Sequence, residues 1–259
     1  MTISDTTRQM LLKNAEHYET TEFLVGDPSW WMHQVTGDEN QETMAFLASA
    51  LSYGSRKQFM PKIGQMLEWS GGNVHRWVAE GAFGEHLHEG DKGCFYRLYT
   101  KDCMNSFLKA YQQMLKEYGS MGDFIQRNAS DGLSAVQTLC LFFNQPFNQS
   151  SNQTIKPSGT VVPKDATSAC KRLCMFLRWM VRDNSPVDLG LWSDIIDKRT
   201  LIMPLDTHVL QQSVKLGLLT CGSASMSIAR RLTASLAEVF PDDPLRGDFA
   251  LFGYGVEND

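Results

Sequence analysis

Apolar residues recur at helical spacing through most of this chain, and that periodicity limits its fold more than any other feature. The pattern runs through five segments, at residues 42–53, 55–69, 104–117, 133–143 and 223–240. No segment alternates apolar and polar residues as a half-buried strand does. The sequence therefore predicts an all-α fold. Because proline suits the first turn of a helix, we expect the second of these helices to begin near Pro61.

The composition changes abruptly in the middle of the chain. Residues 144–154 read NQPFNQSSNQT, a polar stretch without an apolar period, which indicates a loop, an insertion or a domain joint. We therefore expect two helical regions, over 1–155 and 156–259. The acidic and aromatic arm at 1–40 can pack on either region, including the C-terminal one.

Several classes of protein are excluded at this point. The chain has no run of about 18 apolar residues, so we expect no membrane span. It also lacks a basic and then apolar N-terminal signal, so we expect a cytoplasmic protein with reduced thiols. Its six cysteines are Cys94, Cys103, Cys140, Cys170, Cys174 and Cys221. None of them forms a spacing typical of zinc or iron–sulfur clusters, so we expect no metal and no other cofactor.

The charges are distributed unevenly along the chain. The formal net charge of −5 argues against a uniformly basic protein that coats nucleic acid. Residues 1–55 carry a net charge of −6 and residues 238–259 carry −5, whereas residues 156–182 carry +5. This basic segment is compatible with a local site for a polyanion, and equally with the solvated face of a helix.

The segment 168–182 (SACKRLCMFLRWMVR) predicts an amphipathic helix. Its apolar stripe consists of Leu173, Phe176, Leu177, Met180 and Val181. Lys171, Arg178 and Arg182 lie on one line on the opposite side. If Ser168 is the N-cap, Lys171 stands in the first turn, where the helix dipole disfavours the ammonium and favours a neutral, nucleophilic amine. The alternative is that Lys171 is simply exposed on the polar face.

A second segment of interest surrounds Asp206. Pro204 and Asp206 stand directly before an amphipathic stretch, 207–216, which stops at Gly217. Asp206 is therefore a candidate N-cap, whose carboxylate accepts backbone N–H bonds. Such a carboxylate is ionised and fixed in place, whether its role is structural or chemical.

Three motifs resemble the helix-hairpin-helix/Gly-Pro-Asp (HhH-GPD) superfamily of DNA glycosylases. Residues 204–209 (PLDTHV) resemble the Pro-Val-Asp-Thr-His/Asn-Val stretch that holds the catalytic aspartate of that superfamily. Residues 168–173 (SACKRL) are similar to the helix start that supplies the lyase-type lysine, and 46–54 (FLASALSYG) to a helix that ends in Leu-Ser-x-Gln/Asn. Residues 170–182 together with 204–209 resemble a bacterial family placed within the superfamily.

The chain departs from the superfamily in two ways. The Leu-Pro-Gly-Val-Gly hairpin that precedes the lysine is absent, since residues 156–166 contain only Gly159. The spacing from Lys171 to Asp206 is 35 residues, with 187–199 as the extra piece. In both respects the layout is most similar to the hairpin-lacking archaeal 8-oxoguanine glycosylases. The chain also has no four-cysteine cluster, so the resemblance implies a member without an iron–sulfur cluster.

The resemblance implies a function and a set of site residues. It implies two helical subdomains with a cleft between them, in a monomer that excises a damaged base from double-stranded DNA. Asp206 would be the catalytic carboxylate, and Lys171 would add AP-lyase chemistry. Phe46 and Tyr53 would line the base pocket, unless they are core residues. The expected DNA contacts are Arg172, Arg178, Arg182, His208, Lys215 and Arg56. The basic line would face the cleft, and the acidic chain ends would be turned away from it.

Two other classes of function remain open from the sequence. The protein can be a DNA- or nucleotide-binding relative without activity, in which Asp206 only caps a helix and Lys171 only contacts a phosphate. It can also be a cysteine hydrolase that uses Cys170, His208 and Asp206, although no activating context for the thiol is visible in the sequence. His208 can equally be an ordinary residue at the start of a helix.

Overall fold

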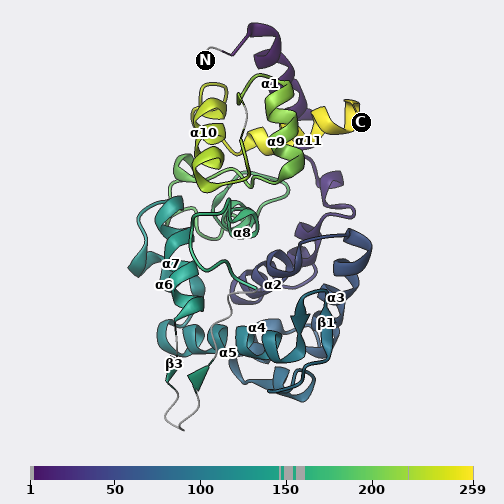
Figure 1. Ribbon diagram of the computed structural model, residues 1–259, viewed down its shortest axis with the longest axis vertical. Helices are drawn as coiled ribbons and strands as arrows, with labels where there is room; N and C mark the ends of the chain where they lie inside the picture. Colours follow the sequence, from purple (N-terminus) through teal and green to yellow (C-terminus); the bar gives the residue numbers. More distant parts are fainter. Residues whose placement is uncertain (1–2, 146, 149–153, 156–160, 221, 259) are drawn as a thin grey trace. The chain divides into compact units, whose positions relative to one another are not determined.

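The computed structural model describes residues 3–145, 147–148, 154–155, 161–220 and 222–258, and these residues are mostly helical (Figure 1). The predicted all-α class is therefore confirmed at the level of secondary structure. Lys156, Gly159, Cys221 and the centre of the predicted loop at 144–154 lie outside the described residues.

The chain forms two compact units. The first unit comprises residues 1–27, 130–136 and 166–259, and the second comprises 28–129 and 137–165. The predicted boundary after residue 155 falls inside the second unit, and only the first 27 residues of the acidic arm belong with the C-terminal region.

The second unit is built around helix α2. Its elements are η2 (Pro28–His33), α2 (Asp38–Leu51), α3 (Arg56–Trp69), α4 (Val74–Ala79), η3 (Ala82–Glu85), β1 (Cys94–Tyr96), β2 (Tyr99–Thr100), α5 (Lys101–Tyr118), α6 (Met121–Asn128), most of α7 (Gly132–Asn144), β3 (Phe147–Asn148) and β4 (Thr154–Ile155). The strands form two antiparallel pairs, β1–β2 and β3–β4. Each strand has only two or three residues, too few for an alternating pattern to reveal them in the sequence.

Helix α2 is buried from Glu42 to Leu51 and organises its neighbours. The carboxylate of Glu42 accepts hydrogen bonds from the backbone N–H groups of Met121 and Gly122, at 2.9 and 3.0 Å. These are free donors at the N-terminus of α6, where the helix dipole favours an anion. A buried charge is thereby satisfied, and α6 is fixed to α2.

Helix α3 corrects the prediction that a helix begins near Pro61. It begins at Arg56, and Pro61 lies within it. The proline removes one backbone hydrogen bond, the one to the carbonyl of Lys57. The helix nevertheless continues because its apolar residues Phe59 and Ile63 are buried on either side of the proline, at 4% and 0% exposure.

The first unit surrounds helix α8. Its elements are α1 (Asp5–Tyr18), η1 (Thr21–Leu24), α8 (Lys171–Val181), η4 (Lys198–Thr200), α9 (Thr207–Lys215), α10 (Met226–Ala237) and α11 (Arg246–Asn258). Helix α1 packs along α11, which also contacts α9. Every residue of α8 from Leu173 to Val181 is buried, so the apolar stripe predicted for this helix is only part of its buried surface.

The predicted basic line of α8 is buried, which is a correction to its expected role. Arg178 and Arg182 are only 3% and 1% exposed. Arg178 forms ion pairs with Asp188 and Asp248. Since its guanidinium is enclosed by carboxylates, Arg178 is not a phosphate contact, and the same holds for Arg182.

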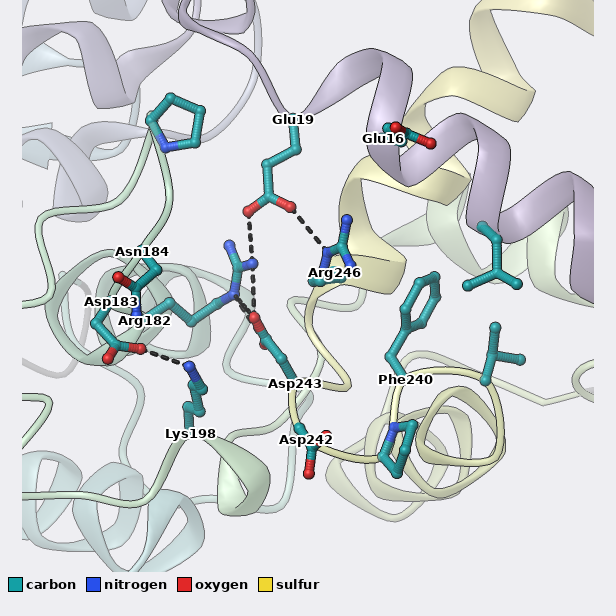
Figure 2. A pocket seen from close by; sticks show the side chains of 14 residues that line it. Glu16, Glu19, Arg182, Asp183, Asn184, Lys198, Phe240, Asp242, Asp243 and Arg246 are labelled. Carbon is teal, nitrogen blue, oxygen red and sulfur yellow. Dashed lines mark hydrogen bonds and ion pairs between the residues drawn. The ribbon is translucent and has the colours of Figure 1, made fainter.

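Arg182 has three acidic partners, two of which, Glu19 and Asp243, are drawn in Figure 2. Its guanidinium pairs with Glu19 at 2.6 Å, with Asp243 at 2.8 Å and with Asp188. These carboxylates raise the pKa of Arg182 further above its ordinary value, although burial alone would lower it. Arg246 binds the other oxygen of Glu19 at 3.1 Å.

The acidic chain ends therefore have the opposite placement to the one expected. Glu19 belongs to the acidic N-terminal segment, and Asp243 and Asp248 belong to the acidic C-terminal segment. All three pair with the basic residues of α8 instead of turning away from them. Part of the uneven charge distribution of the sequence thus forms an internal ion-pair network of the first unit.

We predict that Arg182→Ala destabilises the protein by about 3–5 kcal/mol, because it leaves several buried carboxylates without their guanidinium partner. Urea denaturation followed by circular dichroism measures this loss. Arg199→Ala is the control, since that arginine is 63% exposed and pairs with Asp197 close by in the sequence. It should cost less than about 1 kcal/mol. Equal effects of the two substitutions would contradict the role given to the buried network.

Candidate functional site

Lys171 lies in the first turn of α8, as predicted, but it is the first residue of the helix because the N-cap differs from the one predicted. The N-cap is Cys170, which adopts left-handed backbone angles of φ 45° and ψ 38°. The predicted N-cap, Ser168, instead pairs with Ser225 in an isolated β-bridge. A non-glycine residue in this conformation costs about 1–3 kcal/mol, and such strain gathers at functional sites. The strained turn projects Lys171 directly from the start of the helix.

Asp206 is the N-cap of α9, and this prediction is confirmed. Its Oδ1 accepts the backbone N–H of Val209 at 2.9 Å. The buried segment 201–205 leads to it, held in part by the Met203 N–H that donates to the Thr233 hydroxyl at 2.9 Å. The second carboxylate oxygen, Oδ2, points to another partner.

That partner is Lys171. Its Nζ lies 2.6 Å from Asp206 Oδ2, although 35 residues separate the two in the sequence. The side chains of Lys171 and Asp206 are 39% and 35% exposed, so a ligand can reach both. The two residues expected to carry the chemistry are therefore in direct contact at the surface of the first unit.

The contact determines the charge state of the carboxylate. Burial alone would raise the pKa of Asp206, but the charge and hydrogen bond of Lys171 outweigh it. The backbone N–H groups of Val209 and His208 act in the same direction, and the pKa of Asp206 lies below its ordinary value. In the free protein Asp206 is therefore held in its carboxylate form beside Lys171.

Asp248 links this pair to the buried network of α8. It pairs with Arg178, which stands seven residues after Lys171 and thus on the same side of the helix. Burial raises the pKa of Asp248, whereas the charges of Arg178 and Lys171 lower it and that of Asp206 raises it. Sequence reasoning missed Asp248 and Asp188. The signal for Asp248 in the sequence was the acidic C-terminal segment, whose net charge of −5 is opposite to the +5 of the basic segment.

Of the expected DNA contacts, two stand next to the Lys171–Asp206 pair in the chain. Arg172 is half-buried at the second position of α8, and His208 is exposed at the second position of α9. Lys215 is exposed in the last turn of α9. Arg56 is exposed at the start of α3, in the second unit.

Phe46 is a core residue, and its assignment to a base pocket is wrong. It has no exposed surface and packs against Phe107, Tyr111 and Phe143, with ring centroids 5.1–5.4 Å apart. A side chain enclosed in this way cannot contact a base without opening the core of the second unit. For Phe46, the alternative that the residue belongs to the core is therefore the correct one.

Tyr53 is half-buried just after the C-terminus of α2, in the second unit. Its ring packs against Tyr96 and Tyr99, each with a centroid separation of 5.1 Å. The guanidinium carbon of Arg97 lies 5.2 Å from the centre of the same ring. Tyr53 is thus part of an aromatic and cationic cluster with the β1–β2 hairpin.

The contacts favour Lys171 over Cys170 as a nucleophile. Cys170 is 5% exposed, and its Sγ lies 3.5 Å from the Ser168 hydroxyl. The carboxylate that a cysteine hydrolase would use, Asp206, is engaged by Lys171 and by a backbone N–H. A substrate would therefore meet the amine before the thiol.

A cavity of about 540 Å³ lies at the other end of α8, around Arg182 (Figure 2). Arg182 follows Lys171 by 11 residues, a rise of about 16 Å along the helix axis. The charged groups that line the cavity pair largely with one another, as in Asp183–Lys198 at 2.5 Å and Glu19–Arg246 at 3.1 Å. The cavity is therefore separate from the Lys171–Asp206 site.

The described residues offer neither a metal-binding cluster nor a membrane-spanning helix. They contain no cluster of three or more histidine, cysteine, aspartate or glutamate residues that could hold a metal ion. Within the same residues, no helix has the length and apolar character needed to span a bilayer.

We predict that the cap and the charge of Asp206 can be separated by substitution. Asp206→Asn should retain the stability of α9, because an asparagine side chain also accepts the Val209 N–H. Asp206→Ala should lose the cap and about 1 kcal/mol of stability. Thermal unfolding of both variants measures the difference, and an asparagine variant as unstable as the alanine variant would contradict the cap.

The lowered pKa of Asp206 predicts a pH dependence of the same comparison. Because the carboxyl binds protons more weakly in the folded than in the unfolded chain, its charge stabilises the fold above about pH 4 and this contribution is lost as the pH falls. The stability difference between wild type and Asp206→Asn should therefore shrink between pH 6 and pH 3. A difference that grows on acidification would show that the pKa is raised instead.

The chain matches one protein family over most of its length. Residues 27–257 match the family described as "Protein of unknown function (DUF2400)", and this range includes both Lys171 and Asp206. No curated protein gives a significant match, and neither does any solved structure. Because the match covers well over half of the sequence, the chain belongs to the DUF2400 family.

Proposed function

We propose that the protein is a DNA base-excision glycosylase with AP-lyase activity, in which Lys171 is the nucleophile and Asp206 the catalytic carboxylate. The observation that carries this proposal is the 2.6 Å contact between Lys171 Nζ and Asp206 Oδ2, with both side chains more than a third exposed. An accessible amine beside a fixed carboxylate is what imine-forming chemistry requires. The arrangement of two helical subdomains around a DNA-binding cleft belongs to the proposal.

The surroundings of the pair favour an anionic ligand. Lys171 is the first residue of α8, and Asp206 caps α9, so two helix N-termini meet at the pair. The first turn of α8 contains Lys171 and Arg172, has no acidic residue and has no side-chain cap. Helix N-termini attract phosphates through their free N–H groups and their dipole. The phosphodiester groups that flank a target nucleotide fit this environment.

The first chemical step requires a neutral amine. When substrate covers the site and displaces water, the charged pair loses hydration, and a proton can pass from Lys171 Nζ to Asp206 Oδ2 along their hydrogen bond. The amine nitrogen then forms a bond to C1′ of the target nucleotide. The N-glycosidic bond breaks, and the base leaves with the bonding electrons and takes up the proton held on Asp206 Oδ2, which restores the carboxylate.

The carboxylate has a second role in the same step. As the N-glycosidic bond breaks, positive charge develops on the sugar ring, and the anionic form of Asp206 stabilises it. Opening of the ring at O4′ then converts the lysine adduct into an imine. Removal of a C2′ proton expels the 3′ phosphate by β-elimination, which cleaves the strand, and hydrolysis of the imine restores Lys171.

The test is borohydride trapping on duplex oligonucleotides that contain 8-oxoguanine, uracil or an oxidised pyrimidine. Borohydride reduces the imine to a stable amine, so the wild-type protein should become covalently attached to one of these strands. Lys171→Gln should give no adduct, and Asp206→Asn should slow excision by a factor of about 100 or more. Lys13→Gln is the control, because this exposed lysine lies on α1 of the same unit and has no expected contact with DNA.

A wild-type protein that neither forms an adduct nor releases a base from any of these duplexes would contradict the proposal. If it still binds the duplexes, the protein is a non-catalytic relative in which Asp206 acts only as a helix cap. Release of a base without an adduct, retained in Lys171→Gln, would leave a glycosylase without lyase activity.

A further inference from the structure

The tip of the β1–β2 hairpin has an unusual composition. The two strands are joined by Arg97 and Leu98 alone. Arg97 adopts a left-handed φ of 49°, and Leu98 is 76% exposed. Two-residue hairpin tips favour glycine and asparagine, which accept positive φ and are polar or small. An arginine and a leucine here cost both backbone strain and apolar exposure, and the stability of the fold gives no reason for either.

The hairpin is held firmly against the end of α2. The Tyr96 hydroxyl donates a hydrogen bond to the backbone carbonyl of Tyr53, and the Leu98 N–H donates to the Tyr53 hydroxyl at 3.3 Å. The Tyr53 ring also packs against Tyr96 and Tyr99. The exposed leucine therefore projects from a pre-organised support and not from a loose loop.

Arg97 adds a fixed positive charge beside the leucine. Its guanidinium lies over the Tyr53 ring and in the space next to Gly54, where a Cβ atom would come within 2.1 Å of Arg97 Nη1. Gly54 has a φ of 81°, so glycine is required there for its backbone as well. Any side chain at position 54 would displace the guanidinium from this place.

The segments around the tip are basic in a chain that is acidic as a whole. Residues 52–67 and 94–101 contain no acidic residue. Their basic residues are Arg56, Lys57, Lys62, Arg97 and Lys101. One of these, Lys101, pairs with Asp91 at 3.2 Å, and Lys62 lies over the Phe95 ring. A local positive charge of this kind in a protein of net charge −5 fits a polyanionic partner.

We propose that Arg97 and Leu98 form a wedge that enters duplex DNA. Proteins that distort a duplex insert an apolar side chain between base steps, while cations hold the adjacent phosphates. Leu98 has the exposure and rigid support for insertion, and Arg97 has the charge for a phosphate beside it. The choice of duplex DNA as the partner rests on the proposed function.

The experiment measures unstacking directly in the full-length protein. A duplex with 2-aminopurine next to an abasic-site analogue is titrated with Lys171→Gln protein, which binds without cleaving. The fluorescence should rise when this protein binds. In a protein that carries Leu98→Ala as a second substitution, the rise should be several-fold smaller and binding about tenfold weaker. Leu141→Ala in the same background is the matched control, since that leucine is 69% exposed on α7 of the same unit.

A second variant tests the arginine. Arg97→Ala should weaken binding to all duplexes alike and lower the slope of log affinity against log salt by about one, as expected for the loss of one phosphate contact. Thermal unfolding should show that both tip variants remain folded, because neither side chain belongs to the core. An unchanged salt slope would overturn the role of Arg97.

Failure of the wedge and failure of the proposed chemistry give different results. Equal fluorescence for Leu98→Ala and Leu141→Ala, or no rise with any variant, overturns the wedge even if borohydride trapping succeeds. A rise that depends on Leu98, combined with no trapping on any lesion, supports the wedge and overturns the glycosylase chemistry. A rise on single-stranded DNA as large as that on the duplex would also overturn the wedge.

Discussion

The buried pairing of Arg178 and Arg182 with Asp188 is the interaction on which the first unit depends. Isolated charges in a protein interior are so costly that each of these groups requires its partners. The additional partners come from both ends of the chain, through Glu19 after α1, Asp243 before α11 and Asp248 in the first turn of α11. The network therefore explains why the N-terminal segment and the last helix belong to one compact unit with α8.

The same helix carries the candidate chemistry at its other end. The basic line of α8 passes from Arg182, which is 1% exposed, through Arg178 at 3% to Lys171 at 39%. Each of these cations has a carboxylate partner, but only the last pair, Lys171–Asp206, is open to a ligand. The buried pairs fix the helix, so the exposed amine is presented from a rigid element. Rigid support of this kind is what precise catalytic geometry requires.

The sequence predicted what depends on neighbouring residues and failed where distant residues decide. The helical segments and the capping role of Asp206 follow from local spacing, and a family resemblance selected Lys171 and Asp206 as a functional pair. The exposure expected for Arg178 and Arg182 was wrong, because carboxylates such as Asp243, 61 residues after Arg182, enclose them. Phe46 was misplaced for a similar reason, since its neighbours Phe107 and Phe143 come from later helices. Periodicity shows which face of a helix is polar, but not whether another polar face covers it.

The proposed chemistry depends above all on the identity of the nucleophile. Peptide mapping by mass spectrometry of a borohydride-reduced protein–DNA adduct measures this directly, because the reduced sugar remains attached to the residue that attacked C1′. We expect the modification on Lys171. A modification on another lysine or on the N-terminal amine would contradict the assignment of the Lys171–Asp206 pair as the catalytic centre.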